Sequence, residues 1–149
     1  MLEGTTPIDT PKHSFKNFKE ARSWAKENVV GTYKNADTGE NIAVSGVAVE
    51  KYLSDKAVSK SVSLDAHLSA LKVLPKLIEI SILKEKHPDK NENSNVKEIQ
   101  RLFGAIHYEK VVYPVKLTVK VTYIEARKAY SYEVMKIENP TGTLGDRIP

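Results

Sequence analysis

Hydrophobic and polar residues alternate strictly over one stretch in the C-terminal third of the chain. The apolar positions of this stretch are Val115, Leu117, Val119, Val121 and Tyr123. Lys or Thr stands at each position between them, and a period of two is typical of a β-strand with one buried face. The segments 101–108 and 130–137 flank it across short connections. The pattern therefore predicts three antiparallel strands in a meander.

The first half of the chain shows apolar residues at helical spacing instead. Apolar side chains between residues 64 and 74 follow an i, i+3, i+4, i+7 pattern, and Ser63 precedes them as an N-cap. A similar stripe over 15–25 predicts an earlier helix capped by Ser14. The run 42–44 is expected to be a short strand, and a short helix follows it.

Three other segments give weaker or mixed patterns. Residues 54–62 are polar and alternate with small side chains, so we expect a loop there. Pro75 can begin a helical turn, and the β-branched run 77–83 after it could continue that helix or become a strand. Residues 87–95 are predicted to be a polar loop.

These elements predict one α+β domain in which N-terminal helices pack on a C-terminal antiparallel β-meander. A chain of 149 residues is long enough to bury a hydrophobic core that is stable without disulfides or a structural metal ion. Residues 1–13 contain two prolines and are expected to be a flexible leader. The domain itself would span 14–138, and 139–149 would be a tail or a truncated linker.

Composition narrows the function classes. The absence of cysteine excludes disulfides, thiol catalysis and cysteine-ligated zinc, and it agrees with a reducing compartment. No run approaches the roughly 18 apolar residues that a membrane span needs. The N-terminus also lacks the basic start and apolar run of a signal peptide. We therefore expect a cytoplasmic protein without a membrane partner.

The positive charge is concentrated on the predicted strands. Residues 84–136 hold 11 Lys and Arg against 7 Asp and Glu, whereas residues 1–83 hold 11 against 10. A basic surface favours phosphate-bearing partners such as RNA. The alternative interpretation is that the excess serves solubility alone.

Alternation assigns polar side chains to one face of the predicted sheet before any family is considered. That face would carry Arg101, His107, Lys116, Lys120 and Glu133, unless a bulge shifts the phase. Cleaving RNA without metal needs a base for the ribose 2′-hydroxyl, an acid for the leaving 5′-oxygen and cations for the phosphate. The predicted face carries all three kinds of group, because His or Glu can act as the base or the acid, and Lys and Arg are cations. The alternative is an ordinary solvated face of Lys and Thr.

The remaining histidines do not predict a metal site or a cofactor. His67, His87 and His107 are too widely spaced for a local ligand motif. The pair His87 and Asp89 could hold a cation, although in a loop such a pair usually stabilises a turn. His67 lies on the apolar side of its helix, which favours a hydrogen-bonded core histidine.

A series of short motifs between residues 59 and 133 occurs in a recognisable order. The motifs lie at 59–60, 66–68, 77–79, 85–90, 96–105, 113–120 and 130–133. In this order they resemble the nuclease domains of the barnase/EndoU/colicin/RelE-like group in large polyvalent proteins of phages and mobile elements. The resemblance covers about half of the chain.

The resemblance implies helices followed by a four-stranded antiparallel sheet, and metal-independent RNA cleavage. The polar residues that match the family pattern are His67, His87, Asp89, Arg101, Lys116, Tyr130 and Glu133. Members of the family have a histidine immediately before the arginine, where this chain has Gln100.

We therefore predict a metal-independent endoribonuclease domain of the toxin or effector type. His67 or His87 would be the general acid or base, and Arg101 and Lys116 would hold the phosphate. The expected additional substrate contacts are Lys120, Lys90 and Glu133. RNA is the expected partner, and an immunity or antitoxin protein is a further one. The alternatives are a non-catalytic accessory domain that binds nucleic acid or protein, and a purely structural one.

Overall fold

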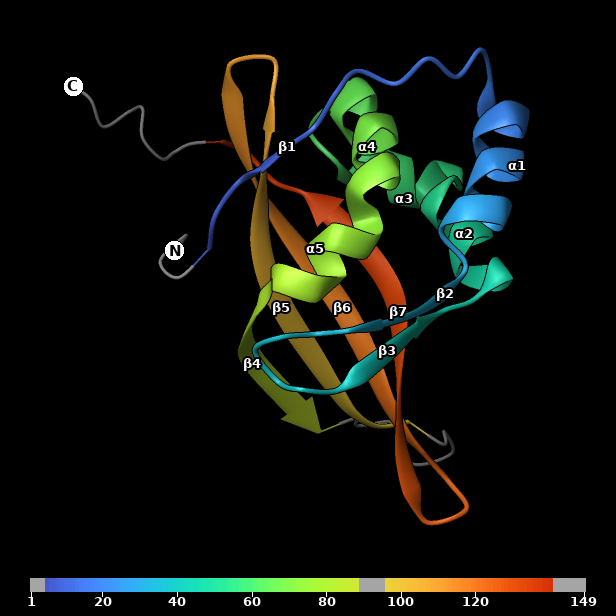
Figure 1. Cartoon of the computed structure of the whole chain (residues 1–149), viewed down its shortest axis with the longest axis vertical. Helices are drawn as coiled ribbons and strands as arrows, with labels where there is room; N and C mark the ends of the chain where they lie inside the picture. Colours follow the sequence, from blue (N-terminus) through green and yellow to red (C-terminus); the bar gives the residue numbers. More distant parts are fainter. Residues whose placement is uncertain (1–4, 89–95, 141–149) are drawn as a thin grey trace, which may run out of the picture.

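The protein folds around a curved mixed β-sheet with helices against one face. The computed structural model describes residues 5–88 and 96–140 (Figure 1). The predicted contact Lys90, its neighbour Asp89 and residues 141–149 of the predicted tail lie outside this range. The strands are β1 (Ile8–Asp9), β2 (Gly31–Lys34), β3 (Asn41–Val44), β4 (Ile82–Pro88), β5 (Val96–Tyr108), β6 (Val111–Ile124) and β7 (Arg127–Ile137).

Most of the helical residues lie between β3 and β4. The helices are α1 (Phe18–Asn28), α2 (Gly46–Tyr52), α3 (Asp55–Lys60), α4 (Leu64–Ala70), the 3₁₀ turn η1 (Leu71–Val73) and α5 (Leu74–Ile80). The serines Ser45, Ser54 and Ser63 cap α2, α3 and α4 by accepting the amide hydrogen of the residue three positions later. The loop predicted over 54–62 is therefore mostly helix α3. Asn17, rather than Ser14, caps α1.

The strands form one sheet in the order β1-β5-β6-β7-β3-β2. The three long strands β5, β6 and β7 pair antiparallel, as the sequence predicted. β3 pairs parallel with β7, and β2 completes that side. The outer edge of β5 is divided between two partners. β1 runs parallel to its C-terminal end, and β4 runs antiparallel to its N-terminal half.

The predicted fold class, N-terminal helices packed on a C-terminal antiparallel meander as in barnase or RelE, is therefore wrong. The molecule is a mixed seven-stranded half-barrel with helices. Three of its strands come from the N-terminal part of the chain, and two of these pair parallel with C-terminal strands. Strands of two and four residues are too short to produce a periodic pattern. The run 42–44 did predict β3, but the parallel partners of β1 and β3 are distant in sequence, so their place in the sheet depends on tertiary packing.

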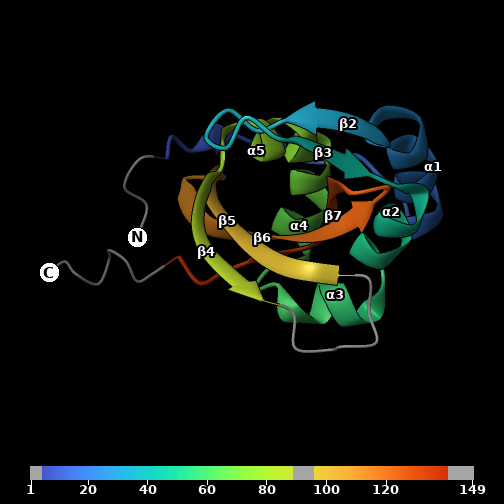
Figure 2. The same cartoon turned by 90° about the horizontal axis from the view of Figure 1, so that it is seen from below.

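The core lies between the inner face of the sheet and the helices. Figure 2 shows β4 to β7 bending around α4 and α5. Val115, Leu117, Val119 and Val121 are each at most 1% exposed, which confirms the buried set predicted for β6. Gly104 brings β5 close to α5, because a Cβ there would lie 2.5 Å from the Ser81 Oγ. Among the described residues, no helix has the length and apolar character required to cross a membrane.

Candidate nucleic-acid interface

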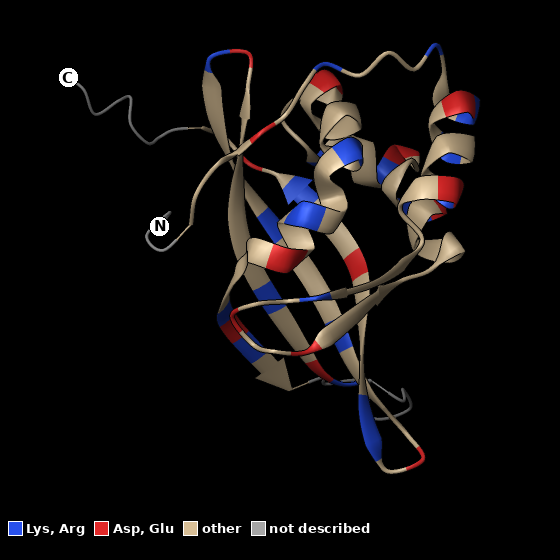
Figure 3. Ribbon diagram, viewed as in Figure 1, with Lys and Arg blue, Asp and Glu red and all other residues tan. Residues whose placement is uncertain are grey.

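The face of the sheet turned away from α4 and α5, here called the open face, collects most of the predicted site residues. Because side chains alternate, the residues of β5 and β6 next to the buried ones point to this side. The strand pairing places Arg101 opposite Thr118, and Phe103 opposite Lys116. The charged side chains described on the open face include Glu85, His87, Arg101, Lys116, Lys120, Glu133 and Lys136. Figure 3 shows Lys and Arg on neighbouring strands of the sheet.

Three cations surround Thr118 on this face. Arg101 is its cross-strand partner, and Lys116 and Lys120 stand two residues on either side of it along β6. Diagonal neighbours in a sheet lie about 7–8 Å apart, within reach of long side chains. The Arg101 Nε is buried and has no hydrogen-bond partner among the described residues. This arrangement can hold an anion between strands β5 and β6.

His87 lies at the β4 end of the open face, beside a carboxylate. Its Nε2 is 3.0 Å from the Glu85 Oε1, and the Arg101 guanidinium is 3.8 Å from the same oxygen. The hydrogen bond from His87 holds the pKa of Glu85 below its ordinary value, and the charges of Arg101 and Lys116 act in the same direction. An ionised carboxylate that orients a histidine, with an arginine next to it, is suited to acid–base chemistry on a phosphate.

Glu133 lies at a β-bulge on the open face. The register of β6 and β7 shifts between Thr118 and Val119, which leaves Glu133 as the extra residue of β7. Its carboxylate accepts from Lys51 at 2.6 Å and lies 3.3 Å from the Lys120 Nζ. Burial opposes its ionisation, but these two lysines outweigh burial and lower the pKa of Glu133. The bulge also changes the phase of β7, so Val134 is half-buried rather than in the core.

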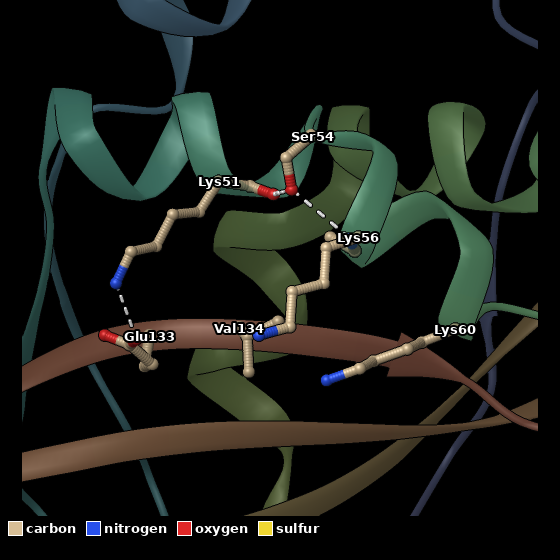
Figure 4. Close-up of a pocket in the computed structure, with 7 residues that line it drawn as sticks. Lys51, Ser54, Lys56, Lys60, Glu133 and Val134 are labelled. Atoms are coloured by element: carbon tan, nitrogen blue, oxygen red, sulfur yellow. Dashed lines mark hydrogen bonds and ion pairs between the residues drawn. The ribbon is translucent and has the colours of Figure 1, made fainter.

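Beyond β7, helices α2 and α3 form the wall of a lysine-lined groove (Figure 4). A hollow of about 240 Å³ lies between Lys51, Lys56 and Lys60 of the helices and Glu133 and Val134 of β7. A second hollow of about 360 Å³ adjoins Lys60, and Lys136 and Glu138 are among its lining residues. We call the two hollows together the lysine groove.

The structure places His67 away from the open face. It is fully buried, and both ring nitrogens have partners: Nε2 is 2.7 Å from the Tyr52 carbonyl, and Nδ1 is 2.7 Å from the Ser61 Oγ. The carbonyl can only accept, so Nε2 carries a proton and the neutral ring accepts from Ser61. Burial lowers the pKa of His67, which favours this neutral form. The Tyr52 hydroxyl donates to the His67 carbonyl, and Ser61 accepts from the Ile137 amide.

Other residues from the sequence analysis also lie apart from this cluster. Tyr130 pairs with Val121 on the helix-facing side, where burial raises its pKa. His107 is at the far end of β5 and contacts Asp9 of β1 at 3.1 Å. Among the described residues, no three His, Asp or Glu side chains gather as a metal site requires.

Sequence reasoning missed several residues of the interface, among them Lys136 of β7. Glu85 belongs to the motif 85–90 but was given no role. Lys51, Lys56 and Lys60 lie in the segment interpreted partly as a loop, and only their density within ten residues was a signal.

Comparisons with known proteins give a family but no activity. Neither the curated proteins nor the solved structures contain a match to this chain. A family model, large polyvalent protein-associated domain 3, matches residues 13–130. This match covers most of the chain and confirms the polyvalent-protein part of the resemblance. The chain belongs to the family of large polyvalent protein-associated domain 3.

Proposed function

We propose that this domain binds single-stranded RNA across its open face and cleaves it without a metal ion. The observation that carries the proposal is the contact chain His87–Glu85–Arg101, with Lys116 and Lys120 beside it. In this arrangement His87 can transfer protons. The cations beside it can hold a phosphate.

In the proposed reaction His87 removes the proton from the ribose 2′-hydroxyl, and Glu85 orients its ring. The 2′-oxygen then attacks phosphorus, and the bond to the 5′-oxygen breaks as that oxygen takes a proton from the Lys120 ammonium group. Arg101 and Lys116 stabilise the negative charge on the phosphate oxygens. Lys120 is a nearby N–H donor, in the cross-strand row of His87 and Ile99. The products are a 2′,3′-cyclic phosphate and a 5′-hydroxyl.

The test is cleavage of end-labelled single-stranded RNA in excess EDTA. Arg101→Ala should lower the rate about 10²–10³-fold, because a guanidinium that holds the phosphate is lost. His87→Ala should lower it about 10²–10⁴-fold. Two matched controls come from the same chain. His107→Ala removes another exposed histidine with a carboxylate partner, and Arg127→Ala removes an exposed arginine at the end of β7.

A wild-type rate that requires a divalent metal would contradict the mechanism. So would controls that lose as much activity as the site variants. Circular dichroism of each variant separates loss of activity from loss of fold.

A second candidate function is non-catalytic RNA binding. The observation that favours it is the location of the hollows, which lie beside β7 rather than beside His87. This candidate predicts RNA binding that depends on Arg101 and Lys116, with no cleavage of any sequence tested.

A further inference from the structure

The lysine groove contains positive charge that the protein itself does not neutralise. Glu133 is shared by Lys51 and Lys120, and Glu138 lies 3.9 Å from Lys116 and 3.8 Å from Lys136. All four of these lysines therefore have a carboxylate nearby.

Lys56 and Lys60 differ from the other lysines of the groove. Neither has an ion-pair partner among the described residues. Figure 4 shows both side chains extending from α3 toward β7, on the side of Val134. Two free ammonium groups thus line a hollow whose other lining residues include Val134, Ala57 and Glu133, the last already paired with Lys51 and Lys120. That combination suits a small, strongly charged anion, and a phosphate group has this character.

The groove is continuous with the cations of the open face. Lys120 of β6 and Lys51 of α2 contact the same carboxylate, so the positive side chains run from Arg101 to α3 across Glu133. Neighbouring strands lie about 4.8 Å apart, so Arg101 on β5 is roughly 10 Å from the backbone of β7. In a stacked strand each nucleotide advances about 3.4 Å along the helix axis. One phosphate cannot occupy both places, whereas a strand of several nucleotides can span them.

We propose that the lysine groove is a second phosphate subsite, in which Lys56 and Lys60 hold a phosphate several nucleotides from the one at Arg101. The subsite rests on the proposed function, because it takes the same RNA strand. It extends binding beyond the site of cleavage and makes affinity depend on RNA length.

The experiment compares two RNAs that carry 2′-O-methyl groups and cannot be cleaved by attack of the 2′-oxygen. One is a dinucleotide with a single phosphate, and the other is a dodecanucleotide. Fluorescence anisotropy gives the dissociation constant of each over a salt series. The double variant Lys56→Ala/Lys60→Ala should flatten the salt dependence for the dodecanucleotide, lowering its log–log slope by about 1.4. Binding of the dinucleotide at Arg101 should not change.

Two further variants control for charge and for fold. Lys19→Ala/Lys76→Ala removes two exposed lysines from α1 and α5, outside the groove, and should leave the slope near that of the wild type. Lys56→Arg/Lys60→Arg keeps both charges and should retain the wild-type slope. Equal slopes for Lys56→Ala/Lys60→Ala and Lys19→Ala/Lys76→Ala would overturn the subsite alone. Failure of the wild type to bind either RNA at low salt would overturn the proposed function together with the subsite.

Discussion

His67 and His87 show how strongly the surroundings of a residue decide its role. His87 is half-exposed, faces a carboxylate and stands next to an arginine. His67 is fully buried, and its ring is hydrogen-bonded to Tyr52 and Ser61. The resemblance named both as acid–base candidates. Only the helical position of His67, on the apolar side, favoured the structural role.

We expect His67 to stabilise the fold in a pH-dependent way. Burial lowers its pKa below the unfolded value of 6.5, so the unfolded chain binds more protons. The contribution of His67 to stability is therefore complete above about pH 6.5 and falls as the pH drops toward the folded pKa. His67→Ala should cost about 2–4 kcal/mol at neutral pH, because it leaves buried polar groups of Tyr52 and Ser61 unpaired.

Urea unfolding between pH 5 and 8, about the range in which histidine titrates, measures this effect. His67→Gln should flatten the fall in stability toward low pH. If the free energy of unfolding falls equally with decreasing pH in the wild type and in His67→Gln, a group other than His67 titrates.

For single residues, the alternation of polar and apolar positions predicted part of the site. It could not predict contacts between residues that are distant in the sequence. Arg101, Lys116 and Lys120 share a face because each neighbours a buried residue in a regular strand. Lys56 and Lys60 join them only through the packing of α3 against β7. Alternation also placed Glu133 on this face, whereas the bulge that turns Val134 to the same side is revealed by no periodic pattern.

At the scale of elements, the sequence predicted those with a strong repeat and two short ones, β3 and α2, but missed others without a repeat. β6 was predicted because its core side chains recur without interruption. β4 was not, because its outer residues are exposed and it lies at an edge of the sheet. A strand with so little burial has no apolar repeat, and His87 and Pro88 were assigned to a loop. Ser54 was the available signal for α3, since it caps that helix as Ser63 caps α4.

The packing of α5 on β5 can be tested at Gly104. A Cβ at this position would lie 2.5 Å from the Ser81 Oγ but 3.5 Å from the Ser81 Cβ and the nearest Leu77 carbon. Gly104→Ala alone should destabilise the protein by about 1–3 kcal/mol. Ser81→Ala should cost little, because the Ser81 Oγ is buried without a hydrogen-bond partner among the described residues.

The double variant Gly104→Ala/Ser81→Ala should regain most of the lost stability. Thermal or urea unfolding of all four proteins gives the coupling free energy of this double-mutant cycle. A coupling near zero would mean that β5 and α5 move apart to accommodate the methyl group, contrary to a close-packed contact.

At the scale of the whole molecule, the net charge of +4 matters less than its distribution. The excess lies on residues 84–136, and the structure gathers Arg101, Lys116 and Lys120 from this segment on one face. If these cations contact phosphates, each one releases counterions on binding.

Removing single cations should therefore change how RNA affinity depends on salt. Lys116→Ala and Lys120→Ala should each lower the log–log slope by about 0.7, measured between roughly 50 and 200 mM salt. Lys110→Ala, at the β5–β6 turn, should leave it unchanged because this residue lies outside the cluster. Equal slopes in all three variants would assign the basic face to solubility.

The edge of β5 that β1 and β4 share has a consequence for how the chain folds during its synthesis on the ribosome. Asp9 of β1 meets His107, a partner 98 residues later. Translation adds about 5–20 residues per second, so the first strand is made roughly 5–20 s before its partner exists. During that interval β1 has no β5 edge on which to dock. The N-terminal strand is thus expected to pair late in synthesis, and the half-barrel closes only after β7, the parallel partner of β3, has also been made.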